Sequence, residues 1–332
     1  MKFSRPLLAL TLWLGSGLMA VSAAPAPEPQ SAIETEVTKE TKEIEETETE
    51  ELELMSEDHC EMHTEDIEIE TTQRIEKKAP VTYPRLFANA ELGFLGVMAH
   101  TIQFSRDNSV IDYVAEGGQD NLFNLAKLSL DLELDPHHKV VFMYQPLTLD
   151  SRAVIERDVT IDNIPFASGT PMTFRYDFPF FRGSYLYDFN PDPREELAAG
   201  ISLQLRDAVI EFASLNGEQF VSNRNVGPVP ILKFRSRHYF NETFWWGSEV
   251  DGFYAPISVL NGSTTDVIGA ILDANLRAGW DINDQHSAFV NLRYLGGGAV
   301  GTSNNPKNLG DGFNDNWLHT IGLTLGVRTA LF

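Results

Sequence analysis

Basic and acidic residues alternate with other residues in two consecutive segments of the chain. Lys233, Arg235 and Arg237 take every second position of one segment, and Glu249 and Asp251 do the same in the next. Residues two apart on a strand share one face of the sheet. A turn with an odd number of residues would set Arg235 opposite Glu249 and Lys233 opposite Asp251. This spacing predicts a network of salt bridges, because charges confined away from water need partners.

The following segments, and two earlier ones, carry more charges of this kind. Asp273 and Arg277 lie on one segment and Arg293 on the next, and a similar register sets Asp273 beside Arg293. Arg182 and Arg206 belong to earlier segments. We expect these side chains to fill and wet one interior. The alternative is a solvated sheet face with ordinary cross-strand pairs.

One cluster of candidate metal ligands lies near the N-terminus, in "SEDHCEMHTED". His59, Cys60 and His63 suit a soft or borderline divalent metal, and a helical turn would bring the two histidines together. The spacing matches no structural zinc pattern, so the alternative is a solvated acidic tail. We expect no cofactor, and a divalent metal on this segment is the one candidate.

Candidate catalytic groups are few. His286 and Ser287 are adjacent but lie at a short turn, and His319 has Thr320 beside it without an acidic partner nearby. Hydrolytic catalysis needs a nucleophile, a base and a group that orients the base. The sequence shows no such set, so we predict no catalytic residues and no enzyme.

Segments of alternating apolar and polar residues carry all the charges of the predicted network. Gly, Asn, Asp and Pro separate these segments, and no helical period competes with the period of two. The fold class is therefore all-β. We predict ten strands, at residues 89–104, 120–134, 139–149, 172–189, 196–212, 228–240, 243–256, 265–281, 286–297 and 315–331.

The connections between these strands alternate in length. "DPHH", "NPDPRE", "NE" and "IND" are short turns, and every other connection is longer. Together with a final strand that ends on Phe332, this pattern resembles the bacterial outer-membrane β-barrel proteins. The resemblance implies an antiparallel up-and-down transmembrane barrel with its long loops outside the cell. It also implies contact with the barrel assembly machinery, although Phe332 falls on the face of Arg328 instead of the apolar face.

The apolar faces indicate which side of this barrel meets the lipid. One face of residues 120–134 carries Leu122, Leu128 and Leu130, and aromatic residues gather near the short turns. An apolar belt edged by aromatic girdles is typical of a surface in contact with outer-membrane lipids. The girdle residues that we expect are Tyr185, Tyr187, Phe189, Phe240, Phe244 and Trp280.

Residues 1–84 differ in composition from the rest. Basic residues, an apolar run and "VSAAPAPEP" predict a signal peptide at 1–23. Residues 24–84 are rich in Glu and Thr and predict a disordered periplasmic arm, since such a composition cannot offset chain entropy. The alternative is a short helical or coiled-coil segment. Residues 85–332 form the barrel. The net charge of −23 argues against nucleic-acid binding, which needs a basic face.

These features predict an exported, non-enzymatic barrel in the outer membrane of a Gram-negative-type cell. Its role would be structural, or the binding of an extracellular or periplasmic ligand. The alternatives are a narrow diffusion pore, an enzyme that hydrolyses outer-membrane lipids or peptides, and a soluble β-sandwich.

Overall fold

The computed structural model describes residues 81–256, 266–302 and 310–332. These residues form strands, turns and loops, with no α-helix among them. Accordingly, no helix in this part of the chain has the length and apolar character needed to cross a bilayer. The predicted signal peptide, nearly all of the acidic arm and the metal cluster at His59, Cys60 and His63 lie outside the described residues.

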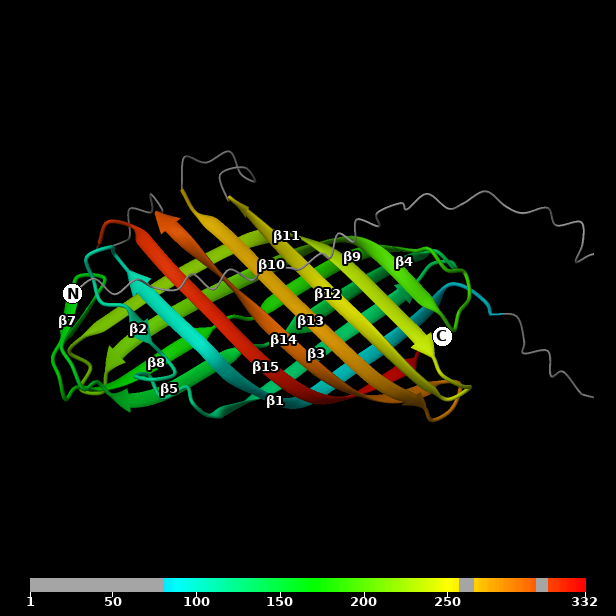
Figure 1. The fold of residues 1–332 in the computed structure, drawn as a ribbon, viewed down its shortest axis with the longest axis horizontal. Helices are drawn as coiled ribbons and strands as arrows, with labels where there is room; N and C mark the ends of the chain where they lie inside the picture. Colours follow the sequence, from blue (N-terminus) through cyan, green and yellow to red (C-terminus); the bar gives the residue numbers. More distant parts are fainter. Residues whose placement is uncertain (1–80, 257–265, 303–309) are drawn as a thin grey trace, which may run out of the picture. The chain divides into compact units, whose positions relative to one another are not determined.

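Ten antiparallel strands form a closed β-barrel, which confirms the predicted fold (Figure 1). Around the ring they are β1 (Arg85–Phe104), β3 (Leu122–Glu133), β4 (His138–Gln145), β9 (Phe180–Asp188), β10 (Glu196–Ser214), β11 (Phe220–Tyr239), β12 (Phe244–Pro256), β13 (Ile268–Asp281), β14 (His286–Thr302) and β15 (Phe313–Ala330).

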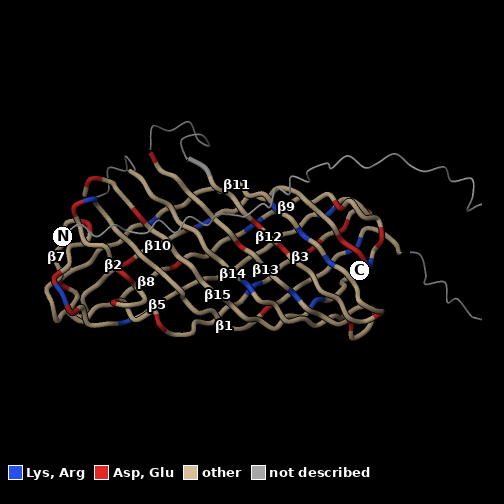
Figure 2. Tube along the Cα trace, viewed as in Figure 1, with Lys and Arg blue, Asp and Glu red and all other residues tan. Residues whose placement is uncertain are grey.

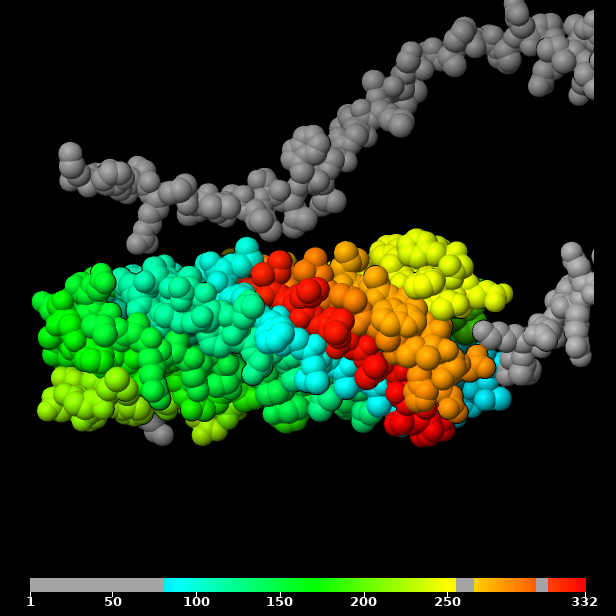
Figure 3. Space-filling view, turned by 90° about the horizontal axis from the view of Figure 1, so that it is seen from below, coloured from blue at the N-terminus to red at the C-terminus, as the bar shows by residue number. Residues whose placement is uncertain are grey.

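The barrel closes between β1 and β15. Their register runs from Phe87 opposite Ala330 to Phe104 opposite Asn314. β1, β15 and β14 cross one face of the barrel diagonally, side by side (Figure 3). A closed ring leaves no strand edge free at this junction, which satisfies the backbone groups that hydrocarbon could not.

The third and fourth predicted strands are each broken in two. β4 is followed by β5 (Thr148–Val154), and β9 is preceded by β8 (Pro171–Asp177). Pro146 stands in the first break and Pro179 in the second, and proline cannot donate a ladder hydrogen bond. The two breaks lie at one level, because Gln145 pairs with Phe180 below them and Thr148 pairs with Asp177 above them.

The short turns lie at one end of the barrel, hereafter the inner end, and the long loops lie at the outer end. An Asp or Asn side chain organises each of the tightest turns by accepting backbone N–H groups. Asp135 Oδ1, for example, accepts from the nitrogens of His137 and His138 at 2.8 and 2.9 Å. These bonds hold the pKa of the Asp135 carboxyl below its ordinary value, and the bond from the His137 nitrogen has the largest effect.

The outside of the barrel is apolar, as the alternation predicts. Leu92, Leu128 and Leu325 are 53–69 % exposed although they sit in the middle of strands. Near the short turns, Phe240, Phe244 and Phe189 are exposed as well. A globular protein in water would bury such a belt. Its exposure all around a closed ring is the arrangement of a barrel surrounded by lipid.

The outer half of the interior holds an apolar core. Tyr113, Phe174 and Phe212 are fully buried there. The connection that contains β2 (Ile111–Asp112) contributes Tyr113, so this long loop folds into the barrel. The hairpin of β6 (Val159–Ile161) and β7 (Ile164–Phe166) adds Ile161 and Phe166 to the same core. The expectation of an interior wetted throughout was therefore wrong for this half.

A β-bulge in β1 delivers His100 to that core. Val97 pairs with Thr320 and Ala99 with His319, so Met98 is an extra residue between them. Both Met98 and Ala99 face outward, and the alternation resumes with His100 pointing inward. His100 stacks on Tyr113 at 4.3 Å between ring centroids, and its Nδ1 lies 2.7 Å from Gln119 Oε1.

Candidate functional site

The inner half of the lumen holds a network of buried charges, hereafter the inner network. Figure 2 shows charged residues gathered along the half of the barrel near the C-terminus, with others at the outer rim. Lys233 pairs with Asp251 and Arg235 with Glu249 in the register of β11 and β12, as their spacing predicts. The Lys233 amine also reaches Glu249, so Nζ lies 2.9 Å from both carboxylates.

Arg182 and Arg293 link this pair of strands to other walls of the barrel. Arg182 Nη1 lies 2.8 Å from Asp251 and 3.1 Å from Asp273. Arg293 Nε lies 2.7 Å from Asp273. In the strand register Arg293 faces Asn275, so its side chain reaches Asp273 diagonally.

Three further arginines lie nearer the inner end and approach acidic side chains of other strands. Arg235 extends away from Glu249 and binds Glu196 at 2.6 Å and Asp131 at 3.0 Å. Arg237 approaches Glu196 at 4.0 Å. Arg277 lies 3.4 Å from Glu91.

Glu91 is a central member that the charge spacing alone did not indicate. Its carboxylate accepts from Lys127 at 2.9 Å, Asn291 at 2.8 Å and Thr324 at 3.0 Å. Glu91 sits between apolar residues on β1, and its inward position could have been found from the alternation with Leu92. Its partners lie on other strands, so they could not have been identified from the sequence around Glu91.

The centre of the inner network is almost fully buried. Arg182, Asp251, Asp273 and Arg293 each retain at most 2 % of their surface exposed. Burying charges this deeply is costly unless they are paired, and each of the four has an opposite charge within 3.1 Å.

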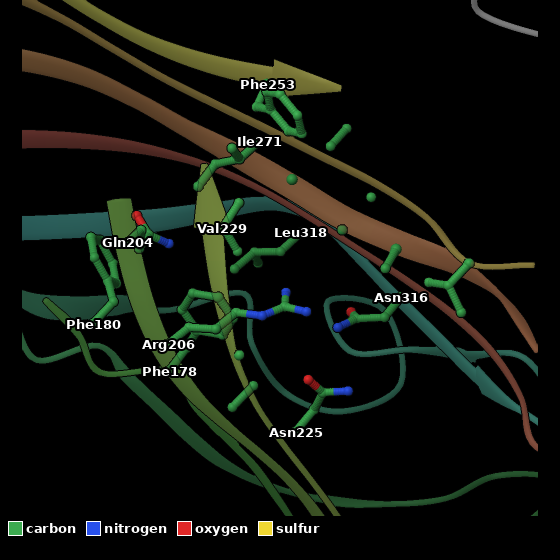
Figure 4. Close-up of a pocket in the computed structure, with 18 of the residues that line it drawn as sticks. Phe178, Phe180, Gln204, Arg206, Asn225, Val229, Phe253, Ile271, Asn316 and Leu318 are labelled. Carbon is green, nitrogen blue, oxygen red and sulfur yellow. The ribbon is translucent and has the colours of Figure 1, made fainter. Parts of the chain in front are cut away.

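Between the inner network and the apolar core lies a cavity of about 680 Å³, hereafter the outer cavity (Figure 4). This volume lies within the range of small-molecule pockets, about 300–1,000 Å³. Phe253, Ile271 and Val229 form one wall, and Phe178 and Phe180 form another. Gly269 of β13 and Gly297 of β14 line the cavity as well.

Arg206 lies in this cavity and not in the predicted network. Its guanidinium lies 5.9 Å from the Phe178 ring and is directed toward Asn316 (Figure 4). Its buried Nε has no hydrogen-bond partner among the described residues. None of the ion pairs formed in this part of the chain includes it. The assignment of Arg206 to the charge network was therefore wrong. The rings of Phe178 and Phe180 lie between Arg206 and Arg182 of the inner network.

Other polar atoms around the outer cavity share this property. Gln204 Nε2, Asn314 Oδ1 and Asn316 Oδ1 are buried without a partner in the described part of the chain. A buried polar atom without a partner costs about 1–3 kcal/mol. These atoms therefore make polar places on a cavity whose walls are mostly apolar.

Three histidines of the barrel strands make side-chain contacts. His286 Nδ1 lies 3.2 Å from Thr329 Oγ1, and His319 Nδ1 lies 2.6 Å from the Tyr294 hydroxyl. His238 binds the Glu195 carboxylate at 2.6 Å, at the inner end. None of the three bonds both a carboxylate and a hydroxyl in this part of the structure.

No family model matches the sequence, and no curated protein matches it. The solved structures that it resembles are bacterial outer-membrane β-barrels. The outer membrane protease OmpT from Escherichia coli matches with a TM-score of 0.41 and 11 % identity, covering 76 % of this chain and 99 % of that chain. The transport unit of the autotransporter AIDA-I from Escherichia coli matches with a TM-score of 0.36 and 9 % identity, covering 77 % and 94 %. A FadL homologue from Pseudomonas aeruginosa matches with a TM-score of 0.33 and 9 % identity, covering 74 % and 90 %.

Proposed function

We propose that this chain is a ligand-binding barrel of the outer membrane of a Gram-negative-type cell, with neither an open pore nor a catalytic site. The membrane location is supported by the apolar belt on a closed ring of strands. Lipid contact at Leu92, Leu128 and Leu325 would remove from water a surface that is otherwise costly to expose.

The observation that carries the ligand-binding role is the outer cavity with its unpaired polar atoms. Arg206, Gln204 and Asn316 present donors and acceptors to a space that is otherwise apolar. A mostly apolar pocket with a few convergent polar groups is the usual form of a small-molecule site.

The absence of a pore is supported by the inner network. A diffusing solute would have to pass Arg182, Asp251 and Arg293, which bond to one another across the lumen through Asp273 and are almost fully buried. The alternative of a narrow diffusion pore would require these ion pairs to open.

Two measurements test the proposal. Unboiled samples of the outer-membrane fraction should migrate faster on detergent gels than boiled samples, because a closed barrel resists detergent until heated. Liposomes that contain the purified protein should not swell in an isotonic solution of a small sugar. A soluble protein, or swelling at the rate of an open porin, would contradict it.

A further inference from the structure

β11 and β12 separate in the outer half of the barrel. Their pairing ends at Leu232 opposite Gly252. Beyond this point β11 pairs only with β10, from Ile231 to Phe220, and β12 pairs only with β13, from Phe253 to Pro256. Among the described residues nothing pairs with the edge of β11 that faces this gap.

Two prolines lie on that edge. Alternate residues of a strand direct their N–H and C=O groups to the same neighbour. The carbonyl of Ser236 lies against Gly247 of β12, so Pro228 and Pro230, an even number of residues away, face β12 as well. Proline has no N–H to offer there, so this edge lacks two of the donors that a β12 partner would use.

The outer cavity crosses this edge to the outside of the barrel. On β11 it is lined by Asn225 and Val229, which face the lumen, and also by Val226 and Pro228, which face outward. Val226 is 67 % exposed. Leu203, a lipid-facing residue of β10, belongs to the lining too. The cavity is thus continuous with the surface that carries the apolar belt.

The two ends of the cavity differ in chemistry. The end at the edge is apolar, with Phe253, Pro228 and Val226. The buried end presents Arg206, whose guanidinium lacks a carboxylate partner among the described residues. A planar guanidinium prefers a carboxylate, which it binds with two parallel hydrogen bonds.

From this arrangement we infer that the gap between β11 and β12 is a lateral portal through which a single-chain carboxylate amphiphile, such as a long-chain fatty acid, enters the outer cavity. The carboxylate binds Arg206, and the chain lies along Phe253 and Pro228 toward the lipid. The inference deepens the proposed function by naming the ligand class and its route, and it rests on that function.

Binding of radiolabelled oleate to the full chain in lipid nanodiscs tests this inference. Arg206→Gln removes the charge, and Gly227→Trp fills the part of the cavity next to the portal, because Gly227 faces the lumen like Asn225 and Val229. The position of a Cβ at Gly227 meets no atom within 4 Å, so a side chain that starts there enters open space. Arg224→Gln is the matched control, because Arg224 pairs with Asp207 outside the cavity and is exposed.

We expect each cavity variant to lower oleate affinity at least tenfold and the control to leave it unchanged. Methyl oleate, which lacks the charge, should compete weakly with oleate for the unaltered protein. Oleate binding that neither variant changes, or a lysophospholipid that competes more strongly than oleate, would overturn the inference. The gel-mobility and liposome experiments test the proposed function independently of oleate. A closed barrel in the membrane would give the expected result in both experiments even if oleate did not bind.

Discussion

The Nη2 atom of Arg182 lies 2.7 Å from Oε1 of Gln204. This contact joins two regions of the lumen, because Arg182 belongs to the inner network and Gln204 lines the outer cavity. Arg206 is the next inward residue after Gln204 on β10, yet it has none of the carboxylates that surround Arg182. One strand therefore carries the boundary between a closed half and a binding half.

The two arginines should respond oppositely to the same substitution. Arg182→Met removes the cation that holds Asp251 and Asp273, and it should lower the free energy of unfolding by about 3–5 kcal/mol, because buried carboxylates lose their partner. Arg206→Met removes an unpaired cation and should leave the stability unchanged or raise it. Urea-induced unfolding in lipid vesicles measures both. A large loss for Arg206→Met would indicate a partner that the described residues do not provide.

The apolar belt predicts a marked difference between two leucines. Leu128→Arg places a charge on the outer face of β3 and should cost about 2–4 kcal/mol if the residue lies near the middle of the bilayer. Leu215→Arg makes the same change in the loop after β10, where the leucine is 56 % exposed, and should cost little. Equal costs in vesicle unfolding experiments would argue against lipid contact at Leu128.

The apolar core at the outer end should also contribute to stability. Phe212→Ala removes a fully buried ring that packs on Tyr113 and Phe174, and it should cost about 3–5 kcal/mol. Phe220→Ala is the comparison, since Phe220 is 56 % exposed on the neighbouring strand. The temperature at which the folded band disappears from gels should fall for the first variant only. A fall of the same size for both would mean that the core is not tightly packed.

Much of the barrel could be predicted from period-two alternation and turn chemistry. These patterns are local, so they indicate strand number, the outward leucines and the cross-strand pair of Lys233 and Asp251. The breaks at Pro146 and Pro179 carried a visible signal too, since proline disfavours the middle of a strand. The bulge at Met98, by contrast, shifts the alternation by one residue, and no residue type in the sequence signals it. The inward direction of the His100 side chain could therefore not be predicted.

The site was less predictable because its contacts cross the lumen. Arg182 and Asp273 come from strands that are not neighbours, and no spacing along the chain indicates that they meet. Arg206 shares the inward face of β10 with Gln204, so the same alternation that predicts an interior arginine cannot tell which half of the interior it enters. Only the three-dimensional position of Phe178 and Phe180 separates it from the network.

The claim that the inner network closes the barrel is tested most directly by single-channel recording in planar bilayers. The unaltered protein should show no discrete openings. Discrete openings of the unaltered protein would contradict the account.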